Sequence, residues 1–149
     1  MNEEISAREL VDQLDEFQKL YSTIEKTILK KNRLNTSSFS IMSQLTEQPL
    51  TLKQLTSLFS LDKSTLSRQV NQLVLKGFIL KEAGTDKRVF YLSTSKEAKQ
   101  LMNAIQYEIE FYIYDLFALW PNDEKKLLLV LLGRMNRRIR LANESKIKQ

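Results

Sequence analysis

Apolar residues recur every three or four positions over much of the chain, which is the spacing of helices that each bury one face. The first stripe predicts a helix over about residues 6–31, and a shorter helix follows the polar residues 35–38 and ends before Pro49. The stripes consist of Leu10, Leu14, Phe17, Tyr21, Ile24 and Ile28 in the first helix, and of Phe39, Met42 and Leu45 in the second. Since the chain has only three glycines and two prolines, we expect long helices to dominate.

Two short helices are predicted in the middle of the chain. Thr51 with Gln54 three residues later is a capping box, which predicts a short helix that carries Leu55 and Leu58. After the three-residue break 59–61, Asp62 is a good N-cap for a second helix, and Gly77 is a natural stop for it. Two helices joined in this way are typical of a helix-turn-helix.

A β-hairpin is predicted directly behind these helices. The segments 79–82 and 88–92 are rich in residues that favour strands, and a charged turn over residues 83–87 separates them. A hairpin that follows a recognition helix is a wing. We therefore predict a mainly helical fold with one small β-hairpin, in which residues about 36–92 form a winged helix-turn-helix lobe that reads DNA.

The C-terminal part of the chain predicts two more helices. Thr94 with Glu97 reads as a capping box, and the helix that it opens ends at Trp120-Pro121. Its apolar residues are Leu101, Ile105, Ile109, Ile113 and Leu116. A cap at Asn122 or Asp123 predicts the last helix, Leu127 to Ala142, whose LLLVLL centre is apolar on every side.

A terminal helix that is apolar all round needs cover on every side, and a partner chain is the expected cover. We therefore predict a single domain over residues 1–149, in which residues about 6–31 and 94–147 form a helical dimerisation lobe. The two ends of the chain differ in charge, since residues 1–19 hold six acids and residues 134–149 hold six bases. This pattern suits terminal helices that lie against one another, an acidic surface that repels nucleic acid, or two solvated helix faces.

The composition excludes several classes of chemistry. The chain has no cysteine and no histidine, so it lacks disulfides, thiolate nucleophiles, the commonest zinc ligands and the commonest general base. We expect no enzyme, no cofactor and no metal site. The longest apolar run, Leu127 to Leu132, is far too short to cross a membrane, and the acidic N-terminus does not resemble a secretory signal. We therefore expect a cytoplasmic protein without a membrane partner.

The polar face of the second short helix holds candidate DNA contacts. On a helix of 100° per residue, Leu66, Val70 and Leu73 share one side, and Ser64, Arg68 and Asn71 lie opposite them. Short hydroxyls and an arginine near the start of a helix are suited to reading base edges in the major groove. The candidate residues on this helix are Lys63, Ser64, Thr65, Ser67, Arg68 and Gln72. An ordinary solvated face is the alternative, and the neighbouring helix and wing favour DNA binding over it.

The predicted wing adds three candidates, Asp86, Lys87 and Arg88. Because Asp86 and Arg88 lie two apart on one edge of the hairpin, their side chains can touch, and the aspartate can hold the arginine toward a narrow minor groove. Lys87 and Lys81 are expected to contact phosphates. A solvated turn with an incidental ion pair is the alternative.

These motifs together resemble the MarR family of bacterial transcriptional regulators. The resemblance rests on Leu55-x-x-Leu58, on the segment DKSTLSRQVNQLVLKGFI, and on the turn Asp86-Lys87-Arg88, with Leu92-Ser93-Thr94 opening a long helix. It implies a winged-helix homodimer, joined through its N- and C-terminal helices, on a pseudo-palindromic site in double-stranded DNA, usually as a repressor that a small-molecule effector releases. It also implies DNA contacts from Ser64, Thr65, Ser67, Arg68, Asp86 and Arg88.

Two further interpretations stay open. A winged helix can also serve as a protein-interaction module that acts on another regulator without reading DNA. The resemblance places effector pockets between the two lobes, where the candidate lining residues are Phe17, Tyr21, Phe39, Met42, Tyr107 and Phe111. Residues of this kind at helical spacing more often belong to the core, so we interpret them as core residues.

Overall fold

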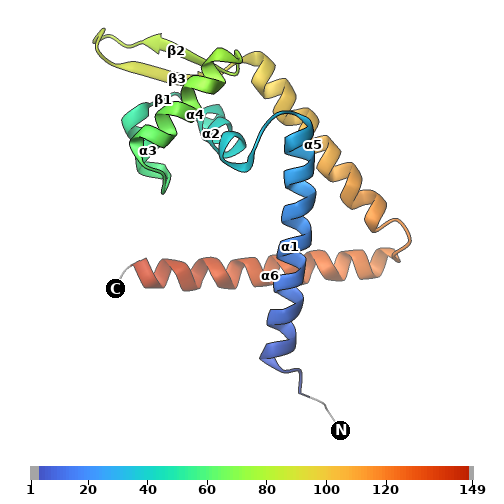
Figure 1. The fold of residues 1–149 in the computed structure, drawn as a ribbon. Coiled ribbons are helices and arrows are strands. Elements are labelled where there is room, and N and C mark those ends of the chain that lie inside the picture. The colour runs from blue at the N-terminus through green and yellow to red at the C-terminus, as the bar shows by residue number, and fades with distance from the viewer. Residues whose placement is uncertain (1–3, 148–149) are drawn as a thin grey trace. The chain divides into compact units, whose positions relative to one another are not determined.

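The computed structural model describes residues 4–147 and contains six helices and three short strands in this range (Figure 1). The helices are α1 (Ala7–Lys31), α2 (Thr36–Glu47), α3 (Leu52–Leu58), α4 (Lys63–Leu75), α5 (Lys96–Leu116) and α6 (Asn122–Ile147). The strands are β1 (Leu50–Thr51), β2 (Ile79–Ala83) and β3 (Phe90–Thr94). The chain divides within α5 into two compact units, one that reaches to Ile109 and one that begins at Glu110.

The first unit is a winged helix. Strands β2 and β3 form an antiparallel hairpin in which Ile79 pairs with Thr94 and Ala83 with Phe90. The turn of the hairpin lies at the end remote from α5 (Figure 1). The sequence did not predict β1, which pairs with β3 through Leu50 and Leu92, so the sheet has three strands in the order β1-β3-β2. A strand of two residues is too short to show alternation, and for that reason it left no sequence signal.

The core of this unit lies where α2, α3, α4 and the sheet meet. Ile41, Met42 and Leu45 of α2 pack with Leu55 of α3 and with Leu66, Val70 and Leu73 of α4. The last turns of α1 supply Ile28 and Leu29, and α5 supplies Ala98 and Ile105. The predicted apolar faces of α2 and α4 are confirmed. The predicted short helix with Leu55 and Leu58 is confirmed as α3, in which Leu55 is buried and Leu58, its last residue, is 56% exposed.

The N-terminal half of α1 carries its apolar stripe on the surface. Leu10, Leu14 and Phe17 are exposed, whereas Ile24 is half-buried and Ile28 is buried. The core interpretation of the six candidate pocket residues is therefore wrong for Phe17, Tyr107 and Phe111, which are exposed, and Tyr21 is half-buried and stacks on Phe17 outside the core. It holds for Met42, and Phe39 packs against the core.

Helix α1 ends in a turn that favours glycine but contains arginine. Leu34 donates its N–H to the Leu29 carbonyl (2.9 Å), and Arg33 donates to Lys30 (3.0 Å). This arrangement is a Schellman motif, which requires a left-handed residue, and Arg33 adopts it with φ of +58°. The Lys76 ammonium donates to the Arg33 carbonyl (3.0 Å) and so joins the ends of α4 and α1.

One predicted cap and one predicted helix start in the first unit differ from the structure. Thr94 does not cap α5, because it is the last residue of β3 and its hydroxyl bonds to that of Thr46 (3.0 Å). The next residue, Ser95, accepts the N–H of Ala98 (3.1 Å) and serves as the cap. The predicted start of α2 after residue 38 is also wrong, because the Asn35 side chain accepts the N–H of Ser38 and caps the helix at Thr36.

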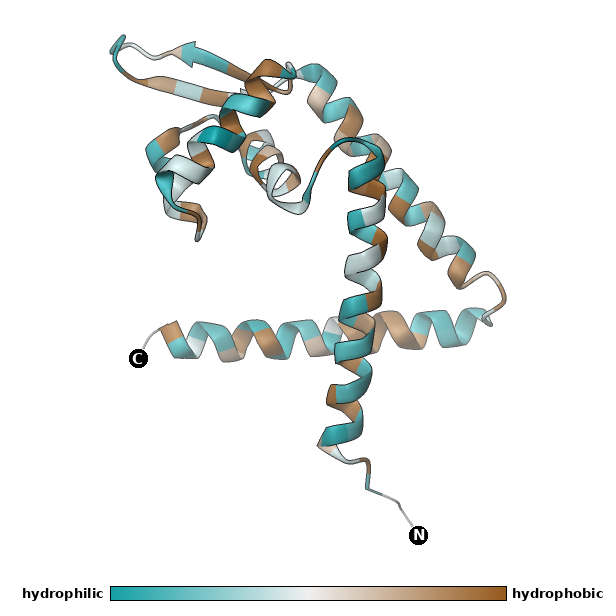
Figure 2. Ribbon diagram, viewed as in Figure 1, coloured by the Kyte–Doolittle hydropathy of each residue, from teal (hydrophilic) through white to brown (hydrophobic). Residues whose placement is uncertain are grey.

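The second unit consists of the end of α5 and the helix α6. Phe117 and Trp120 meet edge to face in the turn between these helices, with ring centroids 4.8 Å apart. Asn122 is already the first residue of α6, so a cap at Asn122 or Asp123 is wrong, and the helix extends at both ends beyond 127–142. No described residue of α6 is buried, and hydrophobic residues recur along the helix (Figure 2). Leu129 in its centre is 73% exposed.

Candidate nucleic-acid interface

Helix α4 begins and ends at well-defined caps. The Asp62 carboxylate accepts the N–H of Thr65 (3.2 Å) and the hydroxyl of Ser64 (2.8 Å). These hydrogen bonds, chiefly the one from Thr65, hold the pKa of Asp62 below its usual value. At the other end, Gly77 has φ of +77°, and Phe78 donates its N–H to the Leu73 carbonyl (2.9 Å). Both predicted boundaries of α4 are confirmed.

Packing of Leu66, Val70 and Leu73 into the core fixes which side of α4 faces solvent. Ser64, Arg68 and Asn71 form one exposed row, each a turn from the next. Lys63 and Gln72 are also exposed, whereas Thr65 and Ser67 are half-buried at the margins of the row. The Ser64 hydroxyl donates its proton to Asp62, so toward a ligand it acts as an acceptor.

The tip of the wing is a tight turn organised by Asp86. The Asp86 carboxylate accepts the backbone N–H of Arg88 (3.1 Å), and the backbone carbonyl of Asp86 accepts the N–H of Val89 (3.0 Å). Gly84 donates its N–H to the Val89 carbonyl (2.8 Å) and closes the turn. A Cβ at Gly84 would lie 2.9 Å from the Tyr91 ring, so any other residue here would have to displace that ring.

The predicted contact between the side chains of Asp86 and Arg88 is therefore wrong. The aspartate binds the main chain of Arg88, and no ion pair joins the two side chains in the range 4–147. The second wing strand begins at Phe90 and not at Arg88 because residues 84–89 form the turn. Lys87 and Arg88 are exposed in that turn.

A depression of about 380 Å³ lies between α4, the start of α3 and the wing. Ser67 of α4 and Arg88 of the wing, both predicted from sequence, line it together. Lys63, Ser64, Thr65, Arg68, Gln72, Asp86 and Lys87 lie outside its lining. Asn71 and Lys53 also line it and were not among the candidates. Asn71 follows Ser67 by one helical turn and could have been found from that spacing, whereas Lys53 gave no signal because the fold alone brings it here.

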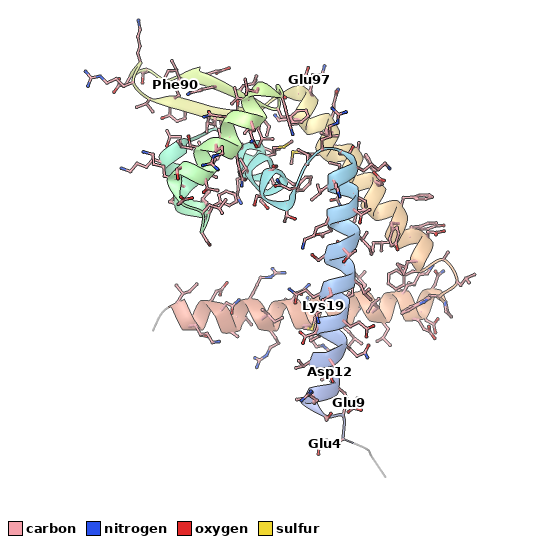
Figure 3. All side chains as sticks on the ribbon, viewed as in Figure 1. Glu4, Glu9, Asp12, Lys19, Phe90 and Glu97 are labelled. Carbon is pink, nitrogen blue, oxygen red and sulfur yellow. The ribbon has the colours of Figure 1, made fainter. Side chains whose placement is uncertain are left out.

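The two charged side chains of β2, Lys81 and Glu82, lie on opposite faces of the sheet. Lys81 pairs with Leu92 in the register of the hairpin, and Glu82 pairs with Tyr91. Since successive side chains of a strand alternate, Lys81, Phe90 and Leu92 share the face toward the depression, and Glu82 lies on the other face. The Lys81 ammonium lies over the Phe90 ring, 4.8 Å from its centroid, and Phe90 can be located on the hairpin in Figure 3.

Other chemistry has little basis in the described residues. Within residues 4–147, no group of three or more acidic, histidine or cysteine side chains is arranged to hold a metal ion. None of the helices in that range is long and apolar enough to cross a membrane.

Comparisons of the sequence with known proteins agree with the winged helix-turn-helix of the structure. A sequence model of the MarR family matches residues 34–90. The HTH-type transcriptional regulator YxaD of Bacillus subtilis (strain 168) is 33% identical over 116 residues, which cover 76% of this chain and 81% of that relative. The chain belongs to the MarR family. The resemblance seen in the sequence is thereby confirmed, and the chain is a MarR-family transcriptional regulator and not an enzyme.

Solved MarR-family structures share the fold. A MarR family protein from Bacillus stearothermophilus has a TM-score of 0.77 at 15% identity, over 92% of this chain and 99% of that chain. A mutant of MepR from S. aureus, bound to an oligodeoxyribonucleotide, has a TM-score of 0.70 at 14% identity, over 91% of this chain and 99% of that chain. The predicted mainly helical winged-helix fold is confirmed by these likenesses.

Proposed function

We propose that this MarR-family regulator binds double-stranded DNA sequence-specifically, as a homodimer that represses transcription from a pseudo-palindromic operator. The exposed row Ser64, Arg68 and Asn71 on a helix that is firmly capped at both ends carries the proposal. A rigid helix with short polar groups and one arginine suits base-edge readout in the major groove. Such a protein acts on DNA in the cytoplasm.

In this proposal Lys63, Ser64, Thr65, Ser67, Arg68 and Gln72 of α4 contact one major groove. Lys87 and Arg88 extend from the wing tip toward the adjacent minor groove, and Asp86 contributes by shaping the turn that presents them. The solved MepR complex with an oligodeoxyribonucleotide supports a DNA-binding role for a fold of this kind. The lobe that reads DNA comprises residues about 36–92.

The homodimer is supported by apolar surface at both ends of the chain. Leu127, Leu129 and Val130 of α6 are exposed, as are Leu10, Leu14 and Phe17 of α1. Monomeric proteins rarely expose so many neighbouring large apolar residues. We propose that α1 with residues 94–147 forms the dimer interface, and that the two α4 helices enter successive major grooves about 34 Å apart. Release by a small-molecule effector that changes this spacing is part of the proposal.

The second candidate function is a protein-interaction module that acts on another regulator. The Phe90 and Tyr91 side chains favour it, since both are exposed on the wing and could contact a protein surface. This alternative expects Arg68 and Arg88 to be dispensable for binding the partner.

The test compares binding of the protein to the DNA upstream of its own gene and to random duplex of the same length, across a salt series. We expect tighter binding to the upstream DNA, weakened by Arg68→Ala by about 1–3 kcal/mol with loss of discrimination. Arg88→Ala should weaken binding as well. Weak binding that is equal on both duplexes and indifferent to both arginines would contradict the proposal and support the protein-interaction function.

A further inference from the structure

We propose that the depression between α3, α4 and the wing seats one phosphate of the DNA backbone in each half-site, and that Lys53 is a contact for this phosphate. The inference rests on the proposed function and adds to it a defined position on the backbone and a residue outside the recognition helix and wing. It follows from the charges around the depression, its donors and its place between the two elements that enter the DNA grooves.

Three cations from three different elements surround the depression. Lys53 comes from α3, Lys81 from β2 and Arg88 from the wing turn. None of the three forms an ion pair within residues 4–147, and no carboxylate is among the lining residues. Glu82, the acid nearest in sequence to Lys81, lies on the opposite face of the hairpin. The depression therefore presents uncompensated positive charge, which attracts an anion.

Uncharged donors complete the lining. Ser67 and Asn71 lie one turn apart on α4 and both border the depression, where a hydroxyl and an amide can donate to the oxygens of a phosphodiester. Phe90 holds the Lys81 ammonium at 4.8 Å above its ring, which limits the positions that this lysine can take. A cation whose position is restricted loses less side-chain entropy when it binds.

The position of the depression identifies the anion as part of the DNA backbone. A major groove and the adjacent minor groove are separated by one sugar-phosphate strand. If α4 lies in the major groove and the wing tip reaches the minor groove, that strand must pass between them. The depression occupies this place, since α4 borders it on one side and Arg88 and Phe90 of the wing on another.

The first experiment removes the charge of Lys53. In a homodimer, Lys53→Ala removes two phosphate contacts, so the slope of log affinity against log salt should fall in magnitude by about 2. We expect operator affinity at physiological salt to fall roughly tenfold without a change in sequence preference. Arg33→Ala, which removes an exposed cation outside both the DNA-reading lobe and the proposed dimer interface, is the matched control and should leave slope and affinity unchanged.

The second experiment locates the phosphate on the DNA. Operator duplexes are prepared with a neutral methylphosphonate at one backbone position per half-site, and the position is moved along each strand. The wild-type protein should lose affinity at one position that no longer matters to Lys53→Ala, because the two changes remove the same contact. Asn71→Asp, which places a negative charge in the depression, should weaken binding more than Asn71→Ala does.

The outcomes separate this inference from the proposed function. If the wild type fails to prefer the operator and Arg68→Ala has no effect, the proposed function itself fails. If the wild type reads the operator but Lys53→Ala behaves like Arg33→Ala, only the phosphate seat is overturned. It is also overturned if every methylphosphonate position that weakens binding of the wild type weakens binding of Lys53→Ala to the same extent, because Lys53 would then contact none of these phosphates.

Discussion

The winged-helix unit and the unit formed by the end of α5 and α6 differ in where their apolar residues go. All of the buried apolar residues described lie between Ile28 and Ile105. Between Glu110 and Ile147 none of the described residues is buried, although α6 carries six consecutive large apolar residues from Leu127 to Leu132. The first unit thus buries an apolar core of its own, although the N-terminal half of α1 stays exposed, and the second unit leaves its apolar surface uncovered.

This difference shows what hydrophobic periodicity measures. Spacing of three or four residues indicates that a helix has an apolar face, and it carries no information about what covers that face. Helix α1 contains both cases, since its stripe is exposed at Leu10 and Leu14 and buried at Ile28. Cover from the same chain and cover from a second copy leave the same pattern in a sequence.

The largest effect is expected from creating a cavity in the core of the winged-helix unit. Leu55→Ala should lower the free energy of unfolding by about 2–5 kcal/mol, because Leu55 is fully buried and its truncation leaves a cavity. Leu75→Ala is the matched control, since Leu75 is 87% exposed at the end of α4, and it should change stability by no more than about 0.5 kcal/mol. Urea unfolding followed by circular dichroism measures both. Equal losses in the two variants would contradict the assigned core.

A smaller effect is expected from charging the uncovered surface. Leu129→Glu should raise the dimer dissociation constant about 100-fold, or about 2.7 kcal/mol, because a symmetric interface contains the substitution twice. Sedimentation velocity at several concentrations measures this change, with Leu75→Glu as the control. An unaltered dimer in Leu129→Glu would show that α6 is not its interface, and the comparison between the units would need another explanation.

The smallest effect concerns the joint at the end of α1. Arg33→Gly should stabilise the protein by about 1 kcal/mol, because a side chain at φ of +58° crowds the backbone in a way that glycine does not. Gly77→Ala should act in the opposite direction by a similar amount, and a Cβ there meets no atom within 4 Å, so backbone conformation alone accounts for the loss. Thermal unfolding measures the pair. A destabilised Arg33→Gly would mean that the arginine side chain has an unrecognised role.

Local signals predicted the winged helix well. Capping at Thr51 and Asp62 and termination at Gly77 depend on neighbouring residues alone, and the structure confirms all three. Where two adjacent residues could both serve as the cap, the choice depended on distant partners. The Thr94 hydroxyl is hydrogen-bonded to the Thr46 hydroxyl, forty-eight positions away, and Ser95 caps α5 in its place.

The candidate interface was predictable to a similar extent. Ser64 and Arg68 follow from helical periodicity, and the structure places both in the exposed row of α4. The predicted contact between the side chains of Asp86 and Arg88 was wrong. An aspartate in a turn can accept the backbone N–H two residues later as readily as it binds a side chain, and Asp86 does so with Arg88. Lys53 was out of reach of any local pattern, since β3 must pair with β1 before α3 can approach the wing.

The hydrogen bond from Lys76 to the Arg33 carbonyl joins residues just beyond the ends of α4 and α1, which are far apart in sequence. Ile28 and Leu29 of α1 belong to the same core as the buried residues of α4, so apolar packing and a hydrogen bond both tie the end of α1 to the body that contains α4. The placement of α4 within its unit therefore depends on residues at the end of α1, which lie outside the helix-turn-helix itself.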